Sequence, residues 1–127
     1  MVSIIIIDSD KFIVKELEFG FRQHNIKCFI IQDPDEGLKI TKKNSGSLII
    51  LELVLPRGDG FEVLEIKTKD PDLVNVPVFV YSKLIQESDR KKALSLGAAE
   101  YWSKSEYSPE EVVKKVVKFI MDKLTDK

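Results

Sequence analysis

Four short apolar runs of this sequence end at residues that can do chemistry. The first run is followed by two acids and a serine, the third ends in a glutamate, the fourth in a serine and the fifth in a lysine. In chain order these residues are Asp8, Ser9, Asp10, Glu52, Ser82 and Lys104. Carboxylates bind a hard cation such as Mg²⁺ or pair with an ammonium group. Since a carboxylate that ends an apolar strand is costly unless it is paired, the pattern indicates a charged pocket where the runs end.

The apolar runs that position these residues have the character of buried parallel strands. Their apolar residues are nearly continuous instead of alternating with polar ones, as expected when helices cover both faces of a sheet. The predicted strands are Ile4-Ile7, Cys28-Ile31, Leu48-Leu53, Val76-Tyr81 and Ala98-Trp102. In open sheets of this kind ligands bind beyond the carboxyl ends of the strands, which is where the charged residues fall.

Helix signals separate the apolar runs. Ser108-Pro109-Glu110-Glu111 joins a capping serine to proline at the first helical position and a glutamate three residues on. Asp33-Pro34-Asp35-Glu36 repeats this pattern, and Gly97 marks the end of a helix that begins near Glu87. The alternation of strands and helices predicts an α/β fold: a flavodoxin-like, doubly wound, five-stranded parallel sheet in the order 2-1-3-4-5, with helices on both faces.

The composition is that of one folded domain. The chain has 127 residues, 43% hydrophobic and 32% charged, so we expect a single domain over residues 1–127. Its net charge of -1 provides no positive field to hold nucleic acid or anionic lipid. The single cysteine, Cys28, forms no internal disulfide, and no apolar stretch is long enough for a membrane span or a signal peptide. We therefore expect a cytoplasmic protein whose primary partner is not nucleic acid.

The most specific stretch of the sequence runs from Leu48 to Leu64 and reads LIILELVLPRGDGFEVL. It resembles the phosphoacceptor strand, the proline-containing loop and the helix-opening Asp-Gly of receiver domains from bacterial two-component response regulators. The spacings of Ser82, Tyr101 and Lys104 are similar to those of the family's switch hydroxyl, switch aromatic and lysine. The resemblance, which extends from Ile4 to the last helix, implies an aspartate that accepts a phosphoryl group with the help of Mg²⁺.

Two residues depart from the family pattern at its chemical centre. Glu52 stands where the family has its phosphoacceptor aspartate, and Ser9 stands where the family has a second acid that binds the metal, which leaves Asp8 as the matching first acid. Asp10 lies one position further and has two interpretations, a helix cap or a substitute for the missing acid, of which we favour the cap. The proline that follows the family lysine is Ser105 here.

The longer side chain at position 52 has a physical consequence. Its carboxylate is expected to pass the metal position and reach toward Ser82 and Lys104. A carboxylate and an ammonium about 4 Å apart attract by roughly 4 kcal/mol at an effective dielectric near 20, before desolvation, so we expect a standing Glu52–Lys104 pair. By the resemblance, a cation would be held by Asp8, Glu52 and the backbone carbonyl of Val54, and the changed acids imply weak or absent Mg²⁺ binding and no other cofactor.

The adjacent aromatics Tyr101 and Trp102 lie in a predicted strand and should face opposite sides, one in the core and one toward a partner. The resemblance places Tyr101 on the surface of the fourth helix, fifth strand and fifth helix, which is often the output face. The alternative is that both rings only pack inside the domain.

We favour an atypical receiver that is not an enzyme and that contacts a sensor histidine kinase or a downstream signalling protein independently of phosphorylation. The alternative is a functional Mg²⁺-dependent phosphoacceptor with autophosphatase activity, carried by Asp8, Asp10 or Glu52. A flavodoxin-like cofactor binder ranks last, because no Ser/Thr/Gly-rich phosphate loop follows the first strand. No output domain is evident, and a single-domain regulator and a piece of a longer protein would look the same.

Overall fold

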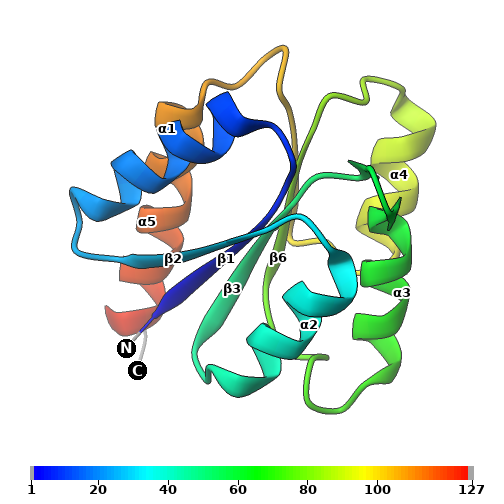
Figure 1. The fold of residues 1–127 in the computed structure, drawn as a ribbon, viewed down its shortest axis with the longest axis horizontal. Coiled ribbons are helices and arrows are strands. Elements are labelled where there is room, and N and C mark those ends of the chain that lie inside the picture. The colour runs from blue at the N-terminus through cyan, green and yellow to red at the C-terminus, as the bar shows by residue number, and fades with distance from the viewer. Residues whose placement is uncertain (1, 126–127) are drawn as a thin grey trace.

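A parallel sheet forms the centre of the computed structural model, which describes residues 2–125 (Figure 1). Its strands lie in the order β2-β1-β3-β6-β7, which is the predicted 2-1-3-4-5 order because β4 and β5 form a separate hairpin. The strands are β1 (Ser3–Ile7), β2 (Lys27–Ile31), β3 (Ser47–Leu51), β4 (Val54–Leu55), β5 (Gly58–Asp59), β6 (Val78–Ser82) and β7 (Glu100–Ser103).

Helices cover both faces of the sheet, as predicted. In Figure 1, α1 and α5 lie on one side and α2, α3 and α4 on the other. Their bounds are α1 (Lys11–Arg22), α2 (Pro34–Lys43), α3 (Gly60–Lys69), α4 (Glu87–Ser95) and α5 (Pro109–Thr125). Within residues 2–125, no helix is long and apolar enough to cross a membrane.

The continuous apolar character of β1 reflects burial on two faces. Ile4 and Ile6 belong to the core under α1 and α5, whereas Ile5 and Ile7 belong to the core under α2, α3 and α4. All four isoleucines are fully buried. Successive side chains of a strand point to opposite faces, so a strand between two helix layers needs apolar residues at every position.

The predicted caps are present at the helix ends. Ser108 and Glu111 form a reciprocal capping box at the start of α5, with nitrogen–oxygen distances of 2.9 and 3.1 Å. Asp33 accepts a hydrogen bond from the Asp35 N–H at the start of α2. Gly97, with φ +99°, follows α4 in the left-handed conformation that glycine adopts most readily.

Each predicted strand is present, but three of them are two residues shorter at one end than predicted, because local groups capture their backbone N–H groups. Strand β3 stops at Leu51, since the N–H groups of Leu53 and Val54 bond to the Glu52 side chain instead of a neighbouring strand. Strand β6 begins at Val78, because the Val76 N–H closes a turn onto Leu73 and proline follows. Strand β7 begins at Glu100 because the Ala98 N–H closes the end of α4.

A close approach of α1 to α5 yields a first prediction. A Cβ atom at Gly20 would lie 2.7 Å from Cγ2 of the buried, β-branched Val113. Gly20→Ala gains up to about 1 kcal/mol of helix propensity, but overpacking typically costs 1–3 kcal/mol, so we expect about 1 kcal/mol of net destabilisation in urea unfolding. In the Val113→Ala background the same change should stabilise the domain. Equal effects in both backgrounds would contradict the close contact.

Candidate functional site

Four strands of the sheet deliver charged and hydroxyl side chains to one place. Asp8 follows β1, Glu52 follows β3, Ser82 ends β6 and Lys104 follows β7. Backbone bonds hold three of them at the edge of the sheet: the N–H groups of Asp8, Glu52 and Lys104 donate to carbonyls of neighbouring strands over 2.7–3.0 Å. The positions of these residues are thus set by the sheet itself and not by a flexible loop.

A single ammonium group lies between two carboxylates at this site. Nζ of Lys104 is 2.9 Å from Oδ2 of Asp8 and 3.0 Å from Oε1 of Glu52. The side chains of both acids are only 3% exposed, and that of Lys104 is 11% exposed. The Glu52–Lys104 pair expected from the sequence is therefore present, and Asp8 shares the same lysine.

The Glu52 carboxylate is surrounded by hydrogen-bond donors. Its Oε2 accepts from the N–H of Leu53 at 2.7 Å, from the N–H of Val54 at 3.2 Å and from the Ser82 hydroxyl. Its Oε1 accepts from the N–H of Lys83 at 3.2 Å in addition to the ammonium. The side chain therefore reaches toward Ser82 and Lys104, as its extra methylene predicts.

The acids that follow β1 have different environments. Oδ1 of Asp8 accepts a hydrogen bond from the Asp10 N–H at 2.9 Å. Asp10 caps α1, because its Oδ1 accepts from the N–H groups of Phe12 and Ile13 at 3.1 Å, while its Oδ2 is 4.0 Å from the Lys104 ammonium. Ser9 is half-buried and takes no part in these contacts. The predicted capping role of Asp10 is confirmed.

The charge balance at the site shifts two pKa values. Burial raises the pKa of Asp8 above its ordinary value, and hydrogen bonds from Asp10 and Lys104 offset this only in part. Burial by itself lowers the pKa of Lys104, but the bonds and charges of Asp8 and Glu52 outweigh burial and raise it. One buried cation thus faces two carboxylates, and burial favours the protonated form of Asp8.

These residues do not fit a Mg²⁺ ion as they stand. The Lys104 ammonium lies between the two carboxylates that the family resemblance assigns to a cation. Across residues 2–125, no group of three or more His, Cys, Asp and Glu side chains is arranged to hold a metal. Mg²⁺ needs near-octahedral oxygen ligands at about 2.0–2.1 Å, whereas these oxygens already accept hydrogen bonds.

A series of hydrogen bonds connects the Glu52 carboxylate to the Tyr101 hydroxyl. The Ser82 hydroxyl donates to Glu52 and accepts from the Leu84 N–H at 3.2 Å, and the Leu84 carbonyl accepts from the Tyr101 hydroxyl at 2.9 Å. Tyr101 is half-buried, while Trp102 is in the core and stacks on Phe79. Sequence reasoning missed Lys83 and Leu84, because both contribute backbone groups, which leave no signal in residue type.

The corner after Lys104 also differs from the family pattern in its bonding. The Ser105 N–H donates to the Ser103 hydroxyl at 3.2 Å, and the two hydroxyls are 2.7 Å apart. A proline at this position has no N–H to donate. Ser105 therefore ties the corner to the end of β7 by a bond that the family's proline cannot form.

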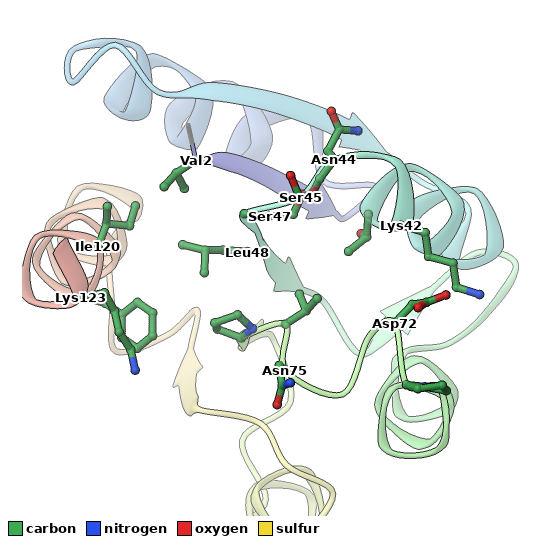
Figure 2. A pocket seen from close by; sticks show the side chains of 16 residues that line it. Val2, Lys42, Asn44, Ser45, Ser47, Leu48, Asp72, Asn75, Ile120 and Lys123 are labelled. Atoms are coloured by element: carbon green, nitrogen blue, oxygen red, sulfur yellow. Dashed lines mark hydrogen bonds between the residues drawn. The ribbon is translucent and has the colours of Figure 1, made fainter. Parts of the chain in front are cut away.

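A cavity of about 800 Å³ lies at the opposite end of the sheet, near the start of the strands (Figure 2). Val2, Leu48 and Ile120 form apolar parts of its lining. Lys42 lies at its rim and pairs with Asp70 at 2.6 Å. Although this cavity is large, its lining brings together no buried charged groups, so the candidate site is the cluster around Lys104.

We predict that Lys104→Ala destabilises the domain by about 3 kcal/mol at neutral pH, because it leaves two buried carboxylates without a cation. In the Glu52→Gln background the loss should be clearly smaller, and urea unfolding of the four proteins measures the coupling. Lys114→Ala, which removes an exposed lysine paired with Glu110 at 3.8 Å, is the matched control and should change little. Simple additivity would show that Glu52 and Lys104 do not interact.

The raised pKa of Asp8 predicts a dependence of stability on pH. The folded state holds the Asp8 proton more tightly than the unfolded chain, so this contribution is present at low pH and is lost as pH rises through the raised pKa. The free energy of unfolding of Asp8→Asn, minus that of the unaltered protein, should therefore increase from about pH 4 to pH 7. A flat difference for Asp8→Asn would refute the shift.

Comparisons with known proteins agree on one family. The family model for the response regulator receiver domain matches residues 4–117. The chain is 32% identical over 109 residues to the probable transcriptional regulator ycf27 of Porphyridium aerugineum, covering 86% of this chain and 44% of that protein. It is 33% identical over 107 residues to the KDP operon transcriptional regulatory protein KdpE of Escherichia coli, covering 82% and 45%. The chain thus spans less than half the length of these relatives.

Solved structures share the fold. The receiver domain of the Francisella response regulator 1452 has a TM-score of 0.81 at 26% identity, covering 97% of this chain and 98% of that one. A CheY-like receiver domain protein from Methanospirillum hungatei has a TM-score of 0.85 at 19% identity, covering 100% and 99%. With the family match over residues 4–117 and four strand ends that meet at Lys104, the chain belongs to the receiver domains of two-component response regulators.

Proposed function

We propose that this chain is an atypical receiver that signals through protein contacts and does not transfer phosphoryl groups. The observation that carries the proposal is the Glu52 carboxylate, which the family resemblance assigns to the phosphoacceptor position and whose two oxygens are both engaged. Receiver domains interact with kinases and other proteins, so the expected partner is a sensor histidine kinase or a downstream signalling protein.

The hydrogen bonding of Glu52 argues against its acting as a nucleophile. A carboxylate has about four lone-pair sites, and this one faces five donors: three backbone N–H groups, one hydroxyl and one ammonium. Attack on phosphorus would require an oxygen to give up donors and align with the leaving group. Because a misplacement of about 1 Å costs roughly 100-fold in rate, the longer side chain adds a second obstacle.

The positive charge that phosphoryl transfer would need, that of Lys104, is already paired with acids. Developing negative charge in the transition state is normally neutralised by Mg²⁺ and a cationic side chain. Here Lys104 is shared by two buried acids, and Ser9 supplies no carboxylate. These contacts support a site whose one cation is already paired with two acids, without an incoming phosphoryl group.

The same contacts support a receiver whose partner-binding surface forms without phosphorylation. Glu52 engages both Ser82 and Lys104, the two groups that the family pattern places at the phosphoryl site. A carboxylate reproduces a phosphoryl group in part, since it has one charge and two oxygens instead of nearly two charges and three oxygens. Although the curated relatives are described as transcriptional regulators, the net charge of -1 favours protein partners over direct DNA contact.

We predict that the unaltered protein remains unlabelled by acetyl phosphate and Mg²⁺, as measured by intact-protein mass spectrometry. Glu52→Asp should restore the shorter nucleophile but label slowly, because Ser9 still leaves out one acid. Only Ser9→Asp together with Glu52→Asp should label readily, since a nucleophile and a metal act as a unit and their effects are strongly non-additive. Ser105→Asp with Glu52→Asp is the matched control for an added acid outside the metal position.

Two outcomes would contradict this account in different ways. Clear labelling of the unaltered protein would overturn the proposed function in favour of a Mg²⁺-dependent phosphoacceptor with autophosphatase activity. Labelling of Glu52→Asp at the rate of the double variant would leave the proposed function in place and refute only the role given to Ser9.

A further inference from the structure

The outer side of β2 is an open edge of the sheet. β2 pairs with β1 along Lys27–Ile31 without a bulge, and it is the outermost strand on its side. After Lys27 its sequence is Cys-Phe-Ile-Ile, which contains no proline and no charge. Proteins usually protect an edge with charges, prolines or bulges, because an exposed apolar edge pairs readily with another strand. The β2 edge is therefore a candidate contact surface.

The backbone groups that point outward from this edge belong to Cys28 and Ile30. The Ile31 carbonyl accepts a hydrogen bond from the Asp8 N–H at 3.0 Å, so the backbone of Ile31 faces β1. Alternate residues of a strand face the same neighbour, so Phe29 also directs its backbone groups to β1. The N–H and C=O groups of Cys28 and Ile30 consequently point away from the sheet, where no strand of residues 2–125 pairs with them.

One face of the β2 edge has both a protruding side chain and a hollow. Ile30 is 36% exposed, although it lies within a strand. The hollow has a volume of about 330 Å³, and Ile26 and Cys28 line it together with Glu18 and Arg22 of α1. Cys28 packs against the core under α1 and α5, and Ile30, two positions further along β2, lies on the same face of the sheet. The hollow has room for one branched side chain such as that of Ile30.

We propose that two copies of this chain associate through β2, with the two strands antiparallel and related by a two-fold axis at Phe29. Cys28 of each copy then lies opposite Ile30 of the other copy, and these opposed residues exchange both of their backbone hydrogen bonds. Because opposed side chains share one face of a sheet, Ile30 of each copy enters the hollow beside Cys28 of the other. The interface is isologous, since the same edge supplies the protruding side chain and the hollow.

Charge favours the antiparallel orientation over a parallel one. Lys27, at the start of β2, is exposed and contacts the Phe29 ring at 4.7 Å, but within residues 2–125 it forms no ion pair. Two acids, Asp33 and the exposed Asp35, follow the other end of β2. Antiparallel strands place Lys27 of each copy near these acids of the other copy, whereas parallel strands would place the two Lys27 side chains together.

Sedimentation velocity tests the proposal over a concentration series from about 10 μM to about 1 mM, in which the unaltered protein should form a dimer. Ile30→Lys should weaken the dimer by about tenfold or more, because an ammonium group would have to enter the hollow. This variant should fold, as circular dichroism checks, since Ile30 is exposed and its N–H points away from β1. Ile66→Lys makes the same change at an isoleucine of α3 that is 42% exposed, and this matched control should dimerise as the unaltered protein does. A monomer at every concentration, or equal weakening by both variants, would overturn the proposal.

Cysteine cross-linking tests the register of the two strands. In the Cys28→Ser background, Phe29→Cys should give a disulfide-linked dimer under mild oxidation, because facing residues of a non-hydrogen-bonded pair have Cα atoms about 4.5 Å apart, within the range of a disulfide. Lys27→Cys in the same background is the control and should cross-link far more slowly, since it lies opposite Ile31 of the other copy. Equal cross-linking of both variants, or none at Phe29→Cys, would refute the two-fold pairing at Phe29. These measurements do not involve Glu52, so their outcome is independent of the proposed function.

Discussion

The structure of the site depends on one buried ammonium group shared by two buried carboxylates. Lys104 lies within 3.0 Å of both Asp8 and Glu52, and all three side chains are almost completely removed from water. Buried charges of this kind are tolerated only when they are paired and hydrogen-bonded. Because each residue comes from a different strand end, this requirement also ties β1, β3 and β7 together at the carboxyl edge of the sheet.

The extra methylene of Glu52 determines which groups its carboxylate contacts. The carboxylate reaches both the Ser82 hydroxyl and the Lys104 ammonium. In addition, the Glu52 carboxylate accepts hydrogen bonds from the backbone N–H groups of Leu53 and Val54. Strand β3 therefore ends earlier than the apolar run of the sequence suggests. The Glu52 side chain thus determines both which groups are paired at the site and where strand β3 ends.

A series of hydrogen bonds, made by side-chain and backbone groups, runs from Glu52 toward the surface. Ser82 joins the carboxylate to the Leu84 amide, and the Leu84 carbonyl joins the loop to Tyr101. Buried polar groups in proteins normally have hydrogen-bond partners. Within residues 2–125, every buried side-chain nitrogen and oxygen has one. The buried Glu52 and the half-buried Tyr101 therefore belong to one hydrogen-bonded unit.

The sequence by itself determined the sheet order, the helix caps and the meeting of Asp8, Glu52, Ser82 and Lys104, because continuous apolar runs imply a doubly covered parallel sheet and the carboxyl ends of its strands meet at one edge. It also predicted the reach of Glu52 from side-chain length. Only the tertiary structure decided that Asp8 and Glu52 share a single lysine, since that depends on distances between strands. The roles of Lys83 and Leu84 rest on backbone groups, which every residue type carries, so only the fold reveals them.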